Sequence, residues 1–252
     1  MLSARSVPIA VLVGAAALNL LAVGGAQAGE PEDSLKKVDQ LLELRPALEK
    51  IDEARRVLDR VLQNDPKCYG ALWRMVRVLY YRGKFGPEAE RLDVYEKAVE
   101  WGKKAVEAND GAVEGHFWLA VAYGLYGEER GVMKSLFLVD DIEAECKRVI
   151  EIDPKYEGGG GHRIFGRVKF KVPGLFGGSN REALEHLRKA LELGPTMPLN
   201  YSYLADVLYD EDEEEEARKL IAGFQAMPVD PYWKTEHEEA MARCREILKD
   251  ME

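Results

Sequence analysis

The feature that most constrains this chain is a repeated spacing of small and apolar residues ahead of a turn residue. In four segments these residues recur at steps of +4, +3 and +5. The first three positions of each set lie on one helical face, and a small residue there lets a neighbouring helix approach closely. Because proline cannot continue the helical hydrogen-bond ladder, the last position ends the helix. The sets are Ala54, Leu58, Val61 and Pro66; Ala98, Gly102, Ala105 and Asp110; Ile142, Cys146, Val149 and Pro154; and Ala183, Leu187, Ala190 and Pro195.

A second apolar helical pattern follows each of these turns. One helix of each kind, joined as a hairpin, is typical of the tetratricopeptide repeat, whose second helix ends A-x3-F-x2-A-x4-P. The sequence therefore predicts an all-α fold of tetratricopeptide-like helical hairpin repeats, stacked as a right-handed solenoid of about four to five units. The apolar positions are Leu72, Met75 and Leu79; Leu119, Ala120 and Tyr123; Leu204, Ala205 and Leu208; and, for a fifth second helix near Glu213, Ala217, Ile221 and Phe224.

The repeat period is longer than the 34 residues of a simple tetratricopeptide unit. The turns at Pro66, Asp110 and Pro154 follow one another at 44 residues, and Pro195 follows after 41. We therefore expect an inserted loop between the two helices of each unit, with the insertions on one side of the array. Helices near residues 30–50 and 233–250 are expected to cap a single domain over residues 29–252.

Residues 1–28 have the composition of a secretory signal peptide. One basic residue, Arg5, precedes an apolar run, and the small-x-small triplet Ala26-Gln27-Ala28 follows that run. The pattern predicts cleavage after Ala28 and a periplasmic location, with retention as an N-terminal anchor as the alternative. Since no cysteine lies near the triplet, the chain is not expected to be a lipoprotein.

The net charge of the chain limits the classes of partner that it can bind. The formal net charge is −10, and an acidic protein repels phosphate backbones, so nucleic acid is not an expected partner.

Cys68, Cys146 and Cys244 are far apart and form no CxxC motif, which does not indicate a disulfide framework. Whether two of them pair, and whether the chain forms a homo-oligomer, stays open at this level.

No pattern typical of catalysis or metal binding is present. His116, His162, His186 and His237 show no ligand spacing, and there is no nucleophile elbow. We therefore expect a non-enzymatic protein without a cofactor or a metal. The run 158–161 of four glycines lacks the strand and the Gly-Lys-Ser/Thr of a phosphate-binding loop. It predicts a turn for close helix packing, or else backbone amides that hold a carboxylate.

The concave side of such an array is the expected binding surface. Aromatic residues with a few basic groups suit an apolar ligand with an acidic end, or a peptide segment. The alternative is that these aromatic residues pack against the inserted loops. Phe176 belongs to the Pro173–Gly178 loop, which either packs into the core or borders the site. The candidate site residues are Trp73, Arg77, Tyr80, Phe117, Val121, His162, Arg163, Arg167, Phe176 and Tyr209.

Residues 156–195 contain a Gly-Gly-Gly-x-x-Arg stretch and a Pro-Gly-x-x-Gly-Gly loop, at Gly159 to Gly161, Arg163, Pro173, Gly174, Gly177 and Gly178. In these two motifs the segment resembles the T-component family of tripartite ATP-independent periplasmic (TRAP) transporters. The resemblance implies a periplasmic helical protein that docks a solute-binding protein and handles a hydrophobic or carboxylated ligand. A general scaffold for segments of other envelope proteins is the alternative function.

Overall fold

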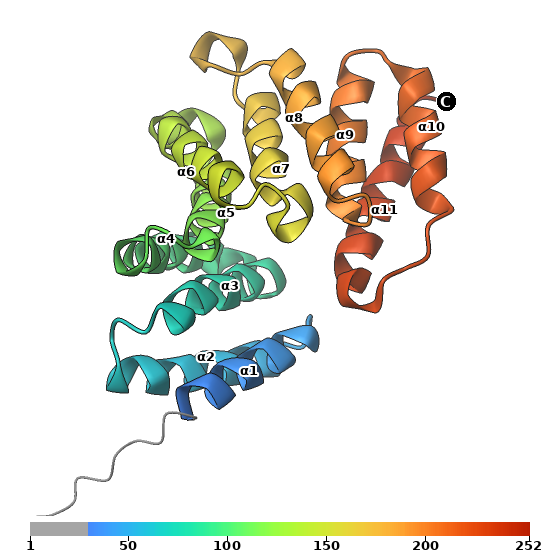
Figure 1. The fold of residues 1–252 in the computed structure, drawn as a ribbon. Coiled ribbons are helices and arrows are strands. Elements are labelled where there is room, and N and C mark those ends of the chain that lie inside the picture. The colour runs from blue at the N-terminus through green and yellow to red at the C-terminus, as the bar shows by residue number, and fades with distance from the viewer. Residues whose placement is uncertain (1–29) are drawn as a thin grey trace, which may run out of the picture.

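The computed structural model describes residues 30–252, and every regular element in that range is a helix (Figure 1). The predicted signal peptide lies outside the described residues. Four short 3-10 helices join the α-helices: η1 (Glu88–Glu90), η2 (Val132–Leu138), η3 (Gly174–Phe176) and η4 (Pro231–Trp233). The α-helices are α1 (Glu30–Glu43), α2 (Leu48–Asn64), α3 (Tyr69–Phe85), α4 (Arg91–Ala108), α5 (Val113–Arg130), α6 (Val139–Ile152), α7 (Tyr156–Lys171), α8 (Asn180–Leu193), α9 (Pro198–Asp210), α10 (Glu214–Gln225) and α11 (Lys234–Asp250).

The helices stack as consecutive antiparallel pairs. Each helix from α1 to α10 packs against the next one, and α11 packs mainly against α9. In addition, α3 packs against α5, α5 against α7, and α7 against α9, so these first helices of each pair form a continuous inner layer. The predicted all-α array of tetratricopeptide-like pairs is confirmed. The predicted insertions hold η1, η2 and η3, one in each of three successive units.

Small residues in the repeated pattern allow the close packing that the sequence predicts. A Cβ placed on Gly102 of α4 would lie 2.9 Å from Leu119 Cδ1 and 3.1 Å from Leu119 Cα. Contacts this short leave no room for a side chain, so the two helices approach with backbone nearly in contact. Cys146 occupies the equivalent position of α6 and is fully buried. Cys68, Cys146 and Cys244 are all free thiols in the described part of the chain.

The glycine run forms a left-handed turn at the start of α7. Glu157, Gly158 and Gly159 have φ values of 48°, 62° and 78°. A Cβ on Gly159 would lie 2.8 Å from the carbonyl oxygen of Ala190, so only glycine fits there without a shift. This turn brings α7 against α8, as the close-packing interpretation predicts. It also places the backbone of Glu157 at the inner surface of the array.

The two ends of the array meet. The connection between α1 and α2, together with α3, faces η4 and α11 across the concave side (Figure 1). The contacts are long polar side chains: Arg45, Arg77 and Lys84 on one side, and Tyr232, Glu236 and Glu239 on the other. We call these six residues the closing interface. None of the α-helices in residues 30–252 is both long and apolar enough to span a bilayer.

Candidate functional site

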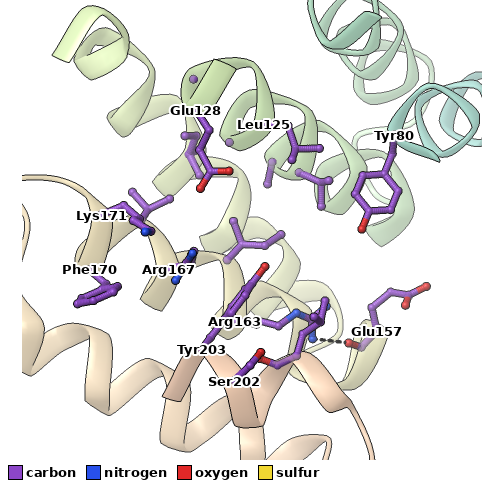
Figure 2. Close-up of a pocket in the computed structure, with 18 of the residues that line it drawn as sticks. Tyr80, Leu125, Glu128, Glu157, Arg163, Arg167, Phe170, Lys171, Ser202 and Tyr203 are labelled. Carbon is purple, nitrogen blue, oxygen red and sulfur yellow. Dashed lines mark hydrogen bonds between the residues drawn. The ribbon is translucent and has the colours of Figure 1, made fainter. Parts of the chain in front are cut away.

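The inner helices and the closing interface surround a central cavity of about 690 Å³. Its walls come from α3, α5, α7 and α9, with η2 and the start of α6 beside them and η4 and α11 opposite. This volume lies within the range of pockets that bind small molecules or short chain segments. Figure 2 shows side chains from three of these helices converging on the same space: Tyr80 from α3, Arg163 from α7 and Tyr203 from α9.

The cavity wall contains seven of the ten residues that the sequence singled out: Arg77, Tyr80, Phe117, Val121, Arg163, Arg167 and Tyr209. The tetratricopeptide register of the inner helices placed six of these residues on the concave side, and Arg163 was named because it follows the glycine run. The closing residues of η4 and α11 were missed, since a terminal helix was expected only to cap the array. Glu157, Lys171 and Tyr203 also line the cavity and were not singled out.

The other three candidates lie outside the cavity. Trp73 is buried in the N-terminal core, and the guanidinium of Arg74 lies over its ring at 4.1 Å. His162 points toward α8, where it contacts His186. Phe176 is in the η3 loop and is 44% exposed. These three residues do not line the cavity: Trp73 packs into the N-terminal core, His162 lies against α8 after the left-handed turn, and the η3 loop carries Phe176 outside the lining.

Most charged groups of the cavity wall are already paired. Arg167 Nη1 lies 2.8 Å from Asp206 Oδ2, and Arg243 Nε lies 2.7 Å from Asp206 Oδ1. Arg77 is buried and donates to Asp39 Oδ1 at 3.2 Å and to the hydroxyl of Tyr232 at 2.8 Å. Arg77 is therefore committed to the fold and to the closing interface, and it is not free for a ligand in the way the sequence suggested.

Arg163 is the exception among the buried basic groups. It is 6% exposed, yet no carboxylate in residues 30–252 lies within ion-pair distance of it. Only Nη1 is hydrogen-bonded: it donates to the carbonyl oxygens of Glu157 at 2.9 Å and Gly158 at 3.4 Å, and to Asn200 Oδ1 at 3.3 Å. Burial lowers the pKa of Arg163, and the nearby carboxyl of Glu157 offsets this effect only in part. A buried charge normally has a partner, so this residue marks a place for an anionic group.

The carboxyl group of Glu157 also faces the cavity without a hydrogen bond or an ion pair among the described residues (Figure 2). Burial raises its pKa, and the nearby charges of Arg77 and Arg163 oppose that effect. The hydroxyl of Tyr203 likewise has no partner within residues 30–252, and its ring lies 4.5 Å from the Arg167 guanidinium. The cavity thus offers an unpaired cation, an unpaired acid and a free hydroxyl, beside the apolar surfaces of Phe117, Val121 and others.

This architecture defines a helical-repeat protein of the tetratricopeptide class. The chain is similar to a thermophilic TPR protein of Thermus thermophilus, with a TM-score of 0.62 and 22% identity over 84% of this chain and 98% of the other. It is also similar to pilF of Pseudomonas aeruginosa, with a TM-score of 0.56 and 18% identity over 88% of this chain and 93% of the other. At these identities the likeness concerns the fold.

Within this class, the chain belongs to the family described as regulator of microtubule dynamics protein 1-3, whose model matches residues 34–176. The Pongo abelii regulator of microtubule dynamics protein 1 is 26% identical over 123 residues, which is 47% of this chain and 39% of that protein. The Bos taurus protein is 26% identical over 124 residues, 47% of this chain and 38% of its own length. The chain therefore spans about two fifths of these relatives. The family shown differs from the transporter family that residues 156–195 resemble.

Proposed function

We propose that this protein is a non-enzymatic interaction scaffold that binds a segment of a partner protein in the central cavity. The observation that carries the proposal is the amphipathic wall of the cavity that the inner helices and the closing interface line. A peptide segment presents amide donors, carbonyl acceptors and side chains together, which suits a wall with an unpaired acid, an unpaired cation and apolar surface. The tyrosine and phenylalanine rings supply rigid contact area at a low cost in side-chain entropy.

Arg163 orients such a segment. A carboxylate of the partner would accept hydrogen bonds from the Nε and Nη2 groups, which make no hydrogen bond within residues 30–252. The charge-assisted contact would be made beside a largely apolar wall, where it is stronger than at a fully exposed surface. The family match includes this residue and five of the other cavity residues named from sequence, all between Arg77 and Arg167.

The test is selection of random peptides on the mature protein, followed by affinity measurements with the selected peptides. We expect enrichment of peptides that carry an acidic group beside apolar residues. Arg163→Gln should weaken their binding by about 1.5–3 kcal/mol, the range for hydrogen bonds to charged groups. The matched control is Arg188→Gln on the outer helix α8, an exposed residue that should leave affinity unchanged.

A second substitution tests the location without changing charge. Val121→Trp adds volume inside the cavity and should block every selected peptide, while circular dichroism shows a retained fold. Peptides that bind the wild type, Arg163→Gln and Val121→Trp equally would place the binding surface elsewhere and refute the proposal.

A second candidate is the transporter accessory role implied by the resemblance of residues 156–195. The supporting observation is the same mixture of apolar wall and buried arginine, which also suits a hydrophobic molecule with an acidic end. In this role the protein would dock a periplasmic solute-binding protein. Native mass spectrometry of the purified chain separates the two candidates, because a retained small molecule adds a discrete mass and an empty scaffold does not.

We further propose that the protein is exported and acts in the periplasm, on the basis of the N-terminal leader pattern. N-terminal sequencing from an export-competent host should find Gly29 first. An intact Met1 in the membrane fraction would favour the retained anchor.

A further inference from the structure

Two histidines that are separated in sequence meet outside the cavity, between α7 and α8. His162 Nδ1 lies 3.0 Å from His186 Nδ1, and the ring centroids are 5.0 Å apart. Both side chains are half-buried and reach solvent. The other two histidines are placed differently: His116 is buried between Glu145 and Asp110, and His237 lies beside Phe224.

The pair is held in place by its surroundings. The ring of His186 stacks on Phe165, with centroids 4.2 Å apart and an interplanar angle of 4°. The two helices are closely packed here, since a Cβ on Gly166 would lie 2.7 Å from Leu187 Cγ. The two imidazoles are therefore fixed by stacking and by the hairpin, and a ligand that binds both would lose little side-chain entropy.

Burial lowers the pKa of both imidazoles and so favours their neutral forms. A neutral imidazole has one ring-nitrogen lone pair that can bind a metal ion. In the hydrogen-bonded pair one Nδ1 carries the proton. If that ring changes tautomer, the proton moves to its Nε2 and both Nδ1 lone pairs become available without loss of a proton from the protein.

The separation of the two nitrogens matches adjacent positions around one metal ion. With metal–nitrogen distances of 2.0–2.1 Å, two ligand atoms lie about 2.9 Å apart at a right angle and about 3.3 Å apart at the tetrahedral angle. The observed 3.0 Å is closest to the right-angle value. Square-planar and octahedral nitrogen sites are typical of Cu²⁺ and Ni²⁺, while tetrahedral Zn²⁺ requires the rings to separate by about 0.3 Å.

We propose that His162 and His186 form a two-ligand site for a late first-row divalent metal ion, with water in the remaining positions. Within residues 30–252 no cluster of three or more His, Cys, Asp or Glu side chains is placed to bind a metal, so these two imidazoles act without a third protein ligand. The ion would bind in exchange with solvent and would link α7 to α8. Since α7 also carries Arg163 and Arg167, the link stiffens one wall of the cavity. The inference does not depend on the proposed function.

The experiment is titration of the untagged, metal-free full-length chain with NiCl2, followed by calorimetry and by thermal unfolding. We expect one Ni²⁺ per chain and a rise in the unfolding temperature with Ni²⁺ concentration, because a ligand that binds only the folded state stabilises it. His162→Gln and His186→Gln should each lower the affinity at least about tenfold, and MgCl2, which favours oxygen ligands, should have no effect.

His237→Gln is the matched control, because it removes a half-buried histidine from α11 and leaves the pair intact. It should bind Ni²⁺ as the wild type does. Circular dichroism establishes that both pair variants fold, and each variant provides an independent measurement. The proposal is overturned if the wild type shows neither heat nor a temperature shift at millimolar Ni²⁺. It is equally overturned if the double variant His162→Gln/His186→Gln retains wild-type affinity.

Discussion

Replacing Glu236 by Ala should destabilise the closed form of the array. Arg45 Nε and Nη2 lie 3.2 and 3.1 Å from the two carboxylate oxygens of Glu236, and the side chains are only 2% and 3% exposed. No other carboxylate in the described residues pairs with Arg45. Removing one partner of such a buried pair leaves an uncompensated charge, which costs about 3–5 kcal/mol.

Opening of the closing interface limits how much stability this substitution can remove. The closing interface joins the ends of the array through long polar side chains, while α11 packs mainly on α9. If separating the two ends costs less than burying an unpaired Arg45, the interface opens and water reaches the guanidinium. Urea unfolding measures the loss of stability, and small-angle X-ray scattering measures the accompanying increase in the radius of gyration.

Two variants make the measurement specific. The double variant Arg45→Met/Glu236→Met replaces the pair by apolar side chains and should recover most of the lost stability. Glu216→Ala breaks an exposed pair with Arg188, whose side chains are 50% and 47% exposed, and should cost less than about 1 kcal/mol. A Glu236→Ala protein that is as stable as Glu216→Ala, with an unchanged radius of gyration, would refute the reasoning.

Two further predictions concern the core and the cavity. Leu187→Ala removes a fully buried side chain and should cost about 2–5 kcal/mol in urea unfolding, with far-ultraviolet circular dichroism still helical. Burial raises the pKa of Glu157 above its usual 4.5, although the charges of Arg77 and Arg163 oppose this shift. The neutral carboxyl therefore contributes to stability at low pH, and this contribution is lost as the pH rises through the raised pKa. Glu157→Gln should therefore be more stable than the wild type at pH 7, and this advantage should disappear in acid; an equal gain at both pH values would contradict the assignment.

The repeated spacing determined the helices because it is a local property. Each helix needs one apolar stripe and one turn residue, and both lie within the sequence of a single repeat unit, as in Ala183, Leu187, Ala190 and Pro195. The same register placed Arg77, Phe117 and Arg167 on the inner side, since neighbouring units repeat the same helical phase. The cap of α8 is equally local: the hydroxyl of Ser179 accepts a hydrogen bond from the Glu182 amide.

Tertiary structure decided which of those residues stay unpaired. The sequence places Arg77 and Arg163 alike as basic candidates for the concave site. In the structure Arg77 donates hydrogen bonds to Asp39 and Tyr232, whereas Arg163 donates only to neutral oxygen acceptors. The difference arises from the curvature of the whole array, which brings η4 and α11 to α3 and leaves the centre of α7 facing the cavity. The curvature is the sum of small rotations between successive units, and the sequence pattern of a single unit does not predict that sum. The contact of His162 with His186 has a different origin, because the left-handed turn at 157–159 sets how α7 is rotated against its neighbour α8.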